Sequence, residues 1–524
     1  MVAASELPID TDATALQMAQ NIFGDGVVVS GATFFGDNDS SGIYTNGDSV
    51  APGVTPGDTG VILSTGDADD FTNSSGQSNQ STNTSTNTRG INNDSQLNAA
   101  AGTNTRDAAI LDIDFTPTGD FMTMQFVFSS EEYPEFQNSV YQDFVGVWIN
   151  GTLVDMAVGN GDTDPGNINS TNNSNLYIDN TSDQYNTEMD GFTVTMTLII
   201  PVNSGVTNTI RIAVADVSDS SYDSNLLIAG NSVQTQVIAI TDSTNLYPNG
   251  SKDLDVLTND INGGGGSLTI THLNGQPVTV GVPILLNTGQ TISLNADGTV
   301  NILGDGDVED FNFTYTIDNG TNTDIGFVNV SSIPCFVTGT MIATQQGQRS
   351  VETLLLGDLV LTKDEGLQPL RWIGQRTVAA EGNFAPIHIC ANTFGTHDEL
   401  MLSPEHRILI GDNLAELLFG EQEVLVSAKD LVNDRSVTRC EGGDVTYVHL
   451  MFDRHQVVYS AGLATESFLP GPQTTKSFER NVVEEICTLF PEIDPDTGLG
   501  YSPAARRILR QFEAKVLVNG QDVA

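Results

Sequence analysis

Short apolar runs between turn residues are the feature that most restricts the fold of this chain. Eight runs of four to nine residues occur in the first 230 positions, and stretches rich in Gly, Asn and Asp separate them. Runs of this length, with apolar and polar residues alternating, are typical of half-buried β-strands. They cover residues 26–30, 60–64, 109–115, 122–128, 144–149, 192–200, 209–215 and 225–228. Residues 1–236 are therefore predicted to form a β-sandwich.

Two parts of this region depart from the strand pattern. Apolar residues recur at helical spacing from Ala15 to Ile22 and predict a helix over residues 12–22. The candidate N-caps are Asp10, Thr11 and Asp12. Residues 66–105 are rich in Asn, Ser and Thr and poor in apolar residues, which predicts a long surface loop.

Two short motifs in the first 236 residues carry a family resemblance. FSSEEYPEF at 128–136 and DSNLLI at 223–228 resemble the choice-of-anchor L domain of bacterial surface and extracellular proteins. This resemblance implies a jelly-roll-like form of the β-sandwich.

A second β unit is predicted over residues 237–333. Its alternating runs are 268–272, 291–294, 299–302, 311–317 and 325–330. The motifs DLDVLTND at 253–260, ADGTV at 296–300 and FTYTI at 313–317 resemble the cadherin-like repeats of large bacterial adhesins. The resemblance implies a small Ig/cadherin-like β-sandwich in a single copy.

Charge separates the last third of the chain from the rest. The chain of 524 residues has a formal net charge of -48 and is long enough for three or four domains. Its first 334 residues hold 41 acidic and four basic residues, and the remaining 190 hold 26 and 15. So few cations cannot displace the counterions of a phosphate backbone, which excludes nucleic acid as a partner. The acidity suits an extracellular or high-salt setting, or serves solubility alone.

Carboxylates near predicted strand ends are the candidate metal ligands. Converging carboxylates repel one another unless a cation relieves the repulsion, and Ca²⁺ prefers oxygen ligands. The candidates are Glu131, Glu132, Asp143, Asp216 and Asp223, and in the second unit Asp255, Asn259 and Asp260. Two interpretations stay open: these residues bind calcium, or they are solvated loop acids and metal-free turns.

Cys335 opens a segment of a different kind. The four cysteines, at 335, 390, 440 and 487, show no CxxC pair and no zinc spacing, so Cys335 is predicted to be a free thiol. A strand, a turn at Gly347 and a second strand follow it. The nearest electrophile to a thiol at this position is the carbonyl of Pro334, so the chemistry that the placement permits is self-cleavage.

The order of short motifs from Cys335 onward resembles the Hedgehog/intein (Hint) family, in its bacterial form. The motifs are CF at 335–336, SVE at 350–352, GDLV at 357–360, RWIG at 371–374, LSPEHRIL at 402–409, HLMFDRH at 449–455 and GLATES at 462–467. The resemblance implies an all-β, horseshoe-like domain over residues 334–472. It also implies cleavage of the Pro334–Cys335 bond by an N–S acyl shift and a thioester, without a cofactor.

Residue roles follow from the same resemblance. Cys335 is the nucleophile, and SPEH matches the family's TxxH motif with Ser in place of Thr. His406 then protonates the departing nitrogen, and Ser403 hydrogen-bonds the scissile carbonyl. The third group stays open among His449, Asp453 and His455. A zinc site is the alternative for the histidines of this region, although their spacing fits no compact zinc motif.

The end of the segment departs from the family pattern. The terminal His-Asn of inteins is absent, and so is an apolar sterol-recognition segment, which leaves hydrolysis or transfer to an amine. Residues 473–524 are predicted to be a helical extension, with helices over 477–490 and 503–516. Arg506, Arg507 and Arg510 make the second helix locally basic.

Localisation is predicted to be extracellular or at the cell surface. The first 20 residues carry acids where a signal peptide carries basic residues, so export without a cleaved N-terminal signal is expected. No stretch reaches the ~20 apolar residues of a transmembrane helix.

The predicted function joins these parts. Two acidic β modules, which could bind a surface ligand, are the substrate of a self-processing domain, and water or an amine is the acyl acceptor. The alternative is a non-catalytic adhesion or calcium-dependent binding protein with an inactive Hint fold.

Overall fold

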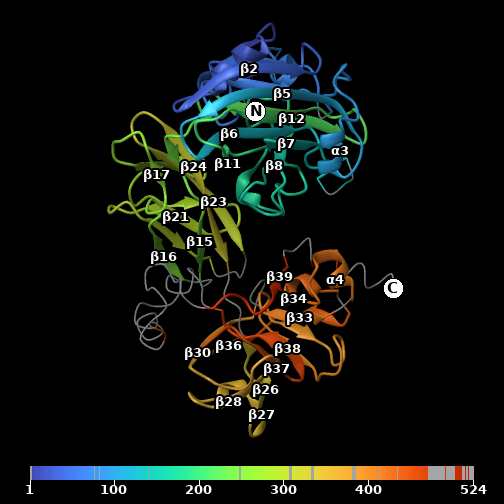
Figure 1. Cartoon of the computed structure of the whole chain (residues 1–524), viewed down its shortest axis with the longest axis vertical. Helices are drawn as coiled ribbons and strands as arrows, with labels where there is room; N and C mark the ends of the chain where they lie inside the picture. Colours follow the sequence, from blue (N-terminus) through green and yellow to red (C-terminus); the bar gives the residue numbers. More distant parts are fainter. Residues whose placement is uncertain are drawn as a thin grey trace. The chain divides into compact units, whose positions relative to one another are not determined.

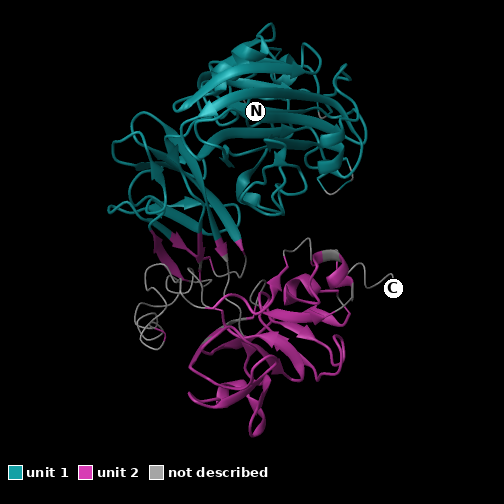
Figure 2. Cartoon of the chain, viewed as in Figure 1, with its two compact units in different colours: residues 1–242, 255–301, 311–329 teal, residues 243–254, 302–310, 330–524 magenta. Residues whose placement is uncertain are grey.

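The computed structural model of the chain is built mainly of β-strands (Figure 1), which confirms the predicted fold class. It describes residues 3–331 apart from 76, 82, 138, 140, 247–249 and 306–309, residues 336–469 apart from 381–384, 412 and 434, and residues 490, 502–509, 514 and 517. Residues 1–242, 255–301 and 311–329 form unit 1, and residues 243–254, 302–310 and 330–524 form unit 2 (Figure 2). Within the described ranges, every helix is too short or too polar to cross a bilayer.

Two antiparallel sheets make up the N-terminal part of unit 1. An eight-stranded sheet has the order β1-β3-β4-β13-β6-β10-β9, with β11 paired to β6, and a five-stranded sheet has the order β2-β5-β12-β7-β8. The first contains β1 (Ile9–Asp10), β3 (Ser41–Thr45), β4 (Thr59–Ser64), β6 (Phe121–Ser130), β9 (Tyr177–Asp179), β10 (Gly191–Thr193), β11 (Met196–Pro201) and β13 (Ser224–Ala229). The second contains β2 (Val27–Phe35), β5 (Thr105–Pro117), β7 (Phe144–Ile149), β8 (Thr152–Leu153) and β12 (Asn208–Val217).

One buried core lies between these two sheets, as the predicted sandwich requires. On β12, Ile210, Ile212 and Val214 belong to that core, whereas Ala213 packs on the opposite face of the sheet. Successive side chains of a strand point to opposite faces of the sheet. Every second side chain of β12 therefore points into the core between the two sheets.

Helix α1 (Ala15–Ile22) packs its apolar face into the same core. Thr14 is its N-cap: the Thr14 hydroxyl accepts from the Gln17 amide at 3.3 Å, and the Gln17 side chain accepts from the Thr14 amide at 2.9 Å. This reciprocal pair is a capping box. The predicted caps Asp10, Thr11 and Asp12 are wrong, because β1 ends at Asp10 and a turn separates it from the helix.

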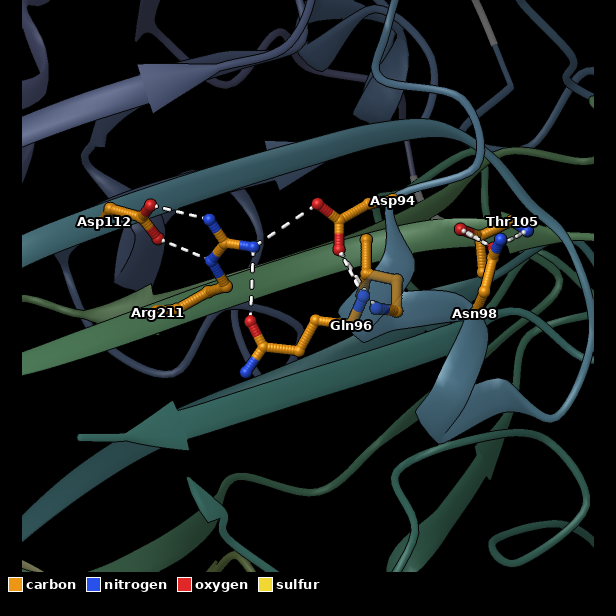
Figure 3. A network of polar contacts seen from close by, with 7 residues as sticks. Asp94, Gln96, Asn98, Thr105, Asp112 and Arg211 are labelled. Carbon is orange, nitrogen blue, oxygen red and sulfur yellow. Dashed lines mark hydrogen bonds and ion pairs between the residues drawn. The ribbon is translucent and has the colours of Figure 1, made fainter. Parts of the chain in front are cut away.

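The Asn/Ser/Thr-rich stretch, predicted to be a surface loop, contains helix α3 (Ser95–Ala101). Leu97 of α3 is fully buried against the five-stranded sheet, and Asp94 caps the helix. Figure 3 shows Arg211 of β12 between Asp112, 2.8 Å away, and Asp94, 3.4 Å away. The buried Leu97 and the ion pairs of Arg211 therefore help to hold this polar stretch on the sheet.

The second β module contains two main sheets. Their orders are β15-β24-β23-β18-β19 and β16-β22-β21-β20, and β14 pairs with β17. The strands are β14 (Val237–Ile238), β15 (Asp242–Asn245), β16 (Ser251–Leu254), β17 (Ile261–Asn262), β18 (Thr269–Leu273), β19 (Gln276–Pro277), β20 (Ile284–Leu285), β21 (Thr291–Leu294), β22 (Val300–Leu303), β23 (Phe311–Asp318) and β24 (Thr323–Ser331). Within unit 1, buried Asp324 of β24 accepts from the Thr197 hydroxyl of β11 at 2.9 Å, which ties the two modules together.

Unit 2 holds two further sheets around a separate core. Their orders are β30-β36-β25-β32-β31-β35 and β27-β26-β28-β37-β38-β33-β34-β39, with β29 paired to β28. The first contains β25 (Phe336–Val337), β30 (Trp372–Ala379), β31 (Ile387–Ile389), β32 (Leu400–Leu402), β35 (Val437–Arg439) and β36 (Asp444–Met451). The second contains β26 (Met341–Thr344), β27 (Gly347–Ser350), β28 (Leu359–Thr362), β29 (Gly366–Pro369), β33 (Arg407–Gly411), β34 (Glu423–Ser427), β37 (Val457–Ser460), β38 (Leu463–Glu466) and β39 (Arg507–Ile508). Helices α2 (Gly47–Val50), in unit 1, and α4 (Asn413–Phe419), in unit 2, are short.

The tail differs from its prediction. Residues 507 and 508, expected inside a helix, form β39, which pairs in parallel with β34. Arg506 bonds Asp364 at 2.7 Å and Glu423 at 2.8 Å, so this arginine binds acids of its own unit. The predicted helix over 477–490 lies outside the described residues apart from Phe490.

The capping box gives a direct test of the helix start. Thr14→Ala is expected to lower the free energy of unfolding of the N-terminal module by about 1 kcal/mol, because the Gln17 amide loses the Thr14 hydroxyl as its partner. Thr11→Ala is the matched control, since the Thr11 hydroxyl makes no hydrogen bond among the described residues. Urea unfolding of the full chain measures both, and equal losses would contradict the Thr14 cap.

Candidate functional site

Strand β25 is the first described segment after Cys335. Phe336 pairs with Leu402 of β32 on one side and with Val448 of β36 on the other. All three side chains are buried. β25 consists of only two apolar residues, but it lies between β36 and β32 and pairs with both, which stabilises so short a strand.

Three of the predicted site residues lie on Phe336 or next in the chain to its strand partners. Ser403 follows Leu402, and His449 follows Val448, so each is one residue beyond a partner of Phe336. Successive side chains of a strand point to opposite faces, so the His449 side chain lies on the face opposite Phe336. The His406 ring packs on the Phe336 ring, with centroids 4.3 Å apart. All three site residues are at most 4% exposed.

Local turns and aromatic contacts fix these side chains. The His406 amide donates to the Ser403 carbonyl at 3.0 Å, which closes a tight turn between β32 and β33. The His449 ring has the rings of Trp372 and Phe468 as neighbours, with centroids 6.5 Å and 5.4 Å away. The SPEH turn and a largely apolar cage thus hold the two imidazoles.

Glu466, which the sequence analysis did not assign, anchors the residue after His406. Its carboxylate is fully buried and accepts from the Arg407 amide at 3.0 Å and from the Arg407 guanidinium at 3.1 Å. The His455 ring lies 3.3 Å from the same carboxylate. Burial alone raises the pKa of Glu466, but Arg407 and His455 outweigh it and lower the pKa to about 2. The sequence signal is its place in the GLATES motif at 462–467, which gives no role to the glutamate.

The remaining candidates for the third group have other partners. The His455 ring accepts from the Ala505 amide at Nδ1, 2.9 Å away, and its Nε2 lies 3.1 Å from the Ser467 carbonyl. Asp453 pairs with Arg371 at 2.8 Å, and its side chain is 56% exposed. His449, by contrast, is next in the chain to Val448, a strand partner of Phe336. Pro334 and Cys335 lie outside the described residues.

The other histidines of unit 2 do not join this group. His388 lies 3.5 Å from Glu399, and His397 accepts from the Phe394 amide at 3.1 Å. Across the ranges that the structure describes, no group of three or more His, Cys, Asp or Glu side chains is arranged to hold a metal ion. The zinc alternative therefore gains no support from these residues.

The acidic candidates in the first module are buried. Glu131, Glu132, Asp143, Asp216 and Asp223 are each at most 3% exposed, so the interpretation of these five as solvated loop acids is wrong. Burial raises the pKa of Glu131 to about 9, of Glu132 to about 8 and of Asp223 to about 7. Burial is the largest cause that raises the pKa of Asp143, and repulsion from the neighbouring Asp216 and Glu132 carboxylates raises it further.

The candidates in the second module stabilise a turn. Asp255 accepts from the Leu257 amide at 3.1 Å and from the Thr258 hydroxyl at 2.6 Å. Asn259 donates to the Ile240 carbonyl at 3.2 Å, and Asp260 accepts from the Ile240 amide at 2.7 Å. These contacts form a turn, and both interpretations of these three residues stay predictions.

The fold defines a multi-module protein built mainly of β-strands. Residues 334–472 match the Hint domain family and residues 8–234 match the Choice-of-anchor L domain family. The chain therefore contains one domain of each family, as the motifs predicted. The cadherin-like character of residues 237–333 stays a prediction.

Solved structures with detectable similarity have low identity. The crystal structure of the gp41-1 intein is 13% identical, with 25% of this chain and 97% of that chain covered and a TM-score of 0.17. A putative β-galactosidase from Bacteroides fragilis is 11% identical, with 50% and 26% covered and a TM-score of 0.13. The pilus backbone of Streptococcus pneumoniae is 12% identical, with 43% and 81% covered and a TM-score of 0.12. No curated protein matches the chain.

The Glu466 network predicts an acid-sensitive contribution to the stability of unit 2. The folded pKa of about 2 lies below the ordinary 4.5, so the stabilisation is complete above pH 4.5 and is lost as the pH falls toward 2. At pH 7, Glu466→Gln is expected to lower the free energy of unfolding by roughly 3 kcal/mol. The difference from wild type should shrink in acid.

Urea unfolding of the full chain between pH 3 and pH 7 measures this effect. Asp453→Asn is the matched control, because its ion pair with Arg371 is exposed and is expected to contribute less than about 1 kcal/mol. A Glu466→Gln loss that stays constant with pH would contradict the assignment.

Proposed function

We propose that the Hint domain cleaves its own chain at the Pro334–Cys335 bond. The Cys335 thiolate attacks the Pro334 carbonyl carbon, a C–S bond forms, and the C–N bond to Cys335 breaks as its nitrogen takes up a proton. Water or an amine then attacks the thioester and releases the thiol. With water, the products are residues 1–334, ending in a carboxylate, and residues 335–524, beginning with a free amine.

The observation that supports this proposal is that Ser403 and His449 follow the two strand partners of Phe336 and that the His406 ring packs on Phe336. Phe336 is the residue that follows Cys335 in the chain. A buried setting suits the three site residues, because hydrogen bonds and proton transfers act more strongly away from water.

Each side chain has a role in the proposal. His406 protonates the departing nitrogen of Cys335, and Ser403 donates a hydrogen bond to the Pro334 carbonyl as negative charge develops on its oxygen. His449 takes the thiol proton. His449 is preferred over Asp453 and His455 because Asp453 is exposed in an ion pair and His455 has partners at both ring nitrogens.

The proposed substrate is the acidic N-terminal part of the same chain. A Choice-of-anchor L domain favours a surface or extracellular setting, which agrees with a net charge of -37 over residues 1–334. Processing would separate this acidic part from the Hint domain or transfer it to an amine on another molecule.

Cys335→Ala is expected to abolish fragment formation, because no other group replaces the thiol. Cell-free synthesis of the full chain followed by mass spectrometry should give fragments of residues 1–334 and 335–524 for wild type and only intact chain for the variant. Hydroxylamine should accelerate wild-type cleavage by attacking the thioester.

Cys390→Ala is the matched control, since Cys390 is a partly buried free cysteine of the same unit. Its fragments should appear at the wild-type rate. A wild-type chain that stays intact with and without hydroxylamine would contradict the proposal and favour a binding protein with an inert Hint fold.

His406→Ala is expected to slow cleavage by about 10²–10⁴-fold, the usual contribution of a positioned general acid. His388→Ala is the control, because His388 pairs with Glu399 away from β25 and should change the rate less than about twofold. Equal rates for the two variants, with folding verified by circular dichroism, would remove His406 from the mechanism.

A further inference from the structure

One end of the N-terminal sandwich gathers carboxylates from both sheets. Glu132 follows β6, and Asp143 precedes β7. Asp216 lies near the end of β12, just after the β-bulge at which the register with β5 shifts beyond Val214. Such bulges re-aim side chains at strand ends. The three carboxylates are 1%, 1% and 2% exposed.

Hydrogen bonds connect these segments. The Asp143 carboxylate accepts from the Val217 amide at 3.1 Å, next to Asp216 in the chain, and from the Ser224 hydroxyl at 2.6 Å. The Ser224 hydroxyl is 2.8 Å from the Ser130 hydroxyl, which accepts from the Glu132 amide at 2.9 Å. Glu132 and Asp216 are thus both held close to Asp143.

Several buried carboxylate oxygens at this end have no hydrogen-bond partner. They include Oε2 of Glu132 and Oδ1 of Asp216. Ion pairs to Glu132, Asp143 or Asp216 are also absent from the described part of the chain, in which Arg and Lys are scarce before Cys335. Burying an ionised carboxylate without a cation or a hydrogen bond is strongly unfavourable. A bound cation beside these oxygens would remove that cost.

We propose that Glu132 and Asp216, with Asp143 between them, form the carboxylate part of a calcium site. The ligand set is entirely oxygen, without His or Cys, which selects a hard cation. Ca²⁺ accepts six to eight oxygens in flexible geometry and takes carbonyls, hydroxyls and water beside carboxylates. Two carboxylates with free oxygens meet that need without a ready-made triad of acids, which the described residues do not contain.

The test uses the full chain carrying Cys335→Ala, so that its outcome does not depend on whether cleavage occurs. Addition of ~1 mM Ca²⁺ after chelation is expected to raise the melting temperature of the N-terminal part by roughly 5–10 °C. Equilibrium dialysis should find bound Ca²⁺. Mg²⁺ at the same concentration should give a smaller shift, because it demands strict octahedral geometry.

The double variant Glu132→Gln with Asp216→Asn locates the site. It is expected to lose the Ca²⁺ shift and, in chelator, to melt at a higher temperature than the parent chain, because two buried carboxyl groups that must take up a proton when no cation is bound are gone. A gain in chelator separates loss of the site from misfolding. Asp255→Asn is the control and should keep the full shift, since Asp255 stabilises a turn in another module.

Three outcomes would overturn the proposal. They are a parent chain indifferent to Ca²⁺, a double variant that keeps the Ca²⁺ shift, and a shift of equal size with Mg²⁺.

Discussion

The pairing of β25 with both β32 and β36 is the constraint on which the C-terminal domain depends. Phe336 has one neighbour at Leu402 and another at Val448, and each neighbour is followed by a polar site residue. The sheet therefore positions Ser403 and His449 through backbone hydrogen bonds, and His406 through ring packing on Phe336. The site candidates are therefore positioned by the strands of the sheet and by the hydrogen-bonded turn between β32 and β33.

Buried charge is handled differently in the two units. Around Glu466, an arginine and a histidine surround the carboxylate, so the anion stays ionised inside the protein. Around Asp143, hydroxyls and amides replace cations, and neighbouring carboxylates add repulsion. The first arrangement is complete within the protein, and the second leaves oxygens unsatisfied. Composition explains the contrast, because only four basic residues precede Cys335.

Strands and the N-terminal helix could be read from the sequence because periodicity is a local property. Every strand predicted in the first module overlaps a strand of the structure, for example residues 144–149 and β7. The helix cap was misplaced, since several polar residues precede α1 and only three-dimensional geometry selects Thr14. Strand β39 was missed because a parallel pair joins segments far apart in the sequence, and its stability comes from β34 rather than from its own residues.

The candidate site was predictable only in part. Ser403 and His406 lie in a recognisable motif, whereas the choice among His449, Asp453 and His455 depends on packing. Asp453 has the right residue type but lies in solvent, paired with Arg371. Glu466 could not be assigned, because a sequence does not tell whether a polar residue at a strand end is buried. The burial of Glu132 and Asp216 was hidden for the same reason.

The parallel contact between β39 and β34 has a consequence for the C-terminal residues. An exposed edge strand has unpaired backbone amides and carbonyls that can pair with another chain and cause aggregation. Residues 507 and 508 pair with β34 at this edge of the sheet. The preceding residue, Arg506, forms ion pairs with Asp364 and Glu423. Residues 507 and 508 therefore shield this edge of the sheet from pairing with other chains.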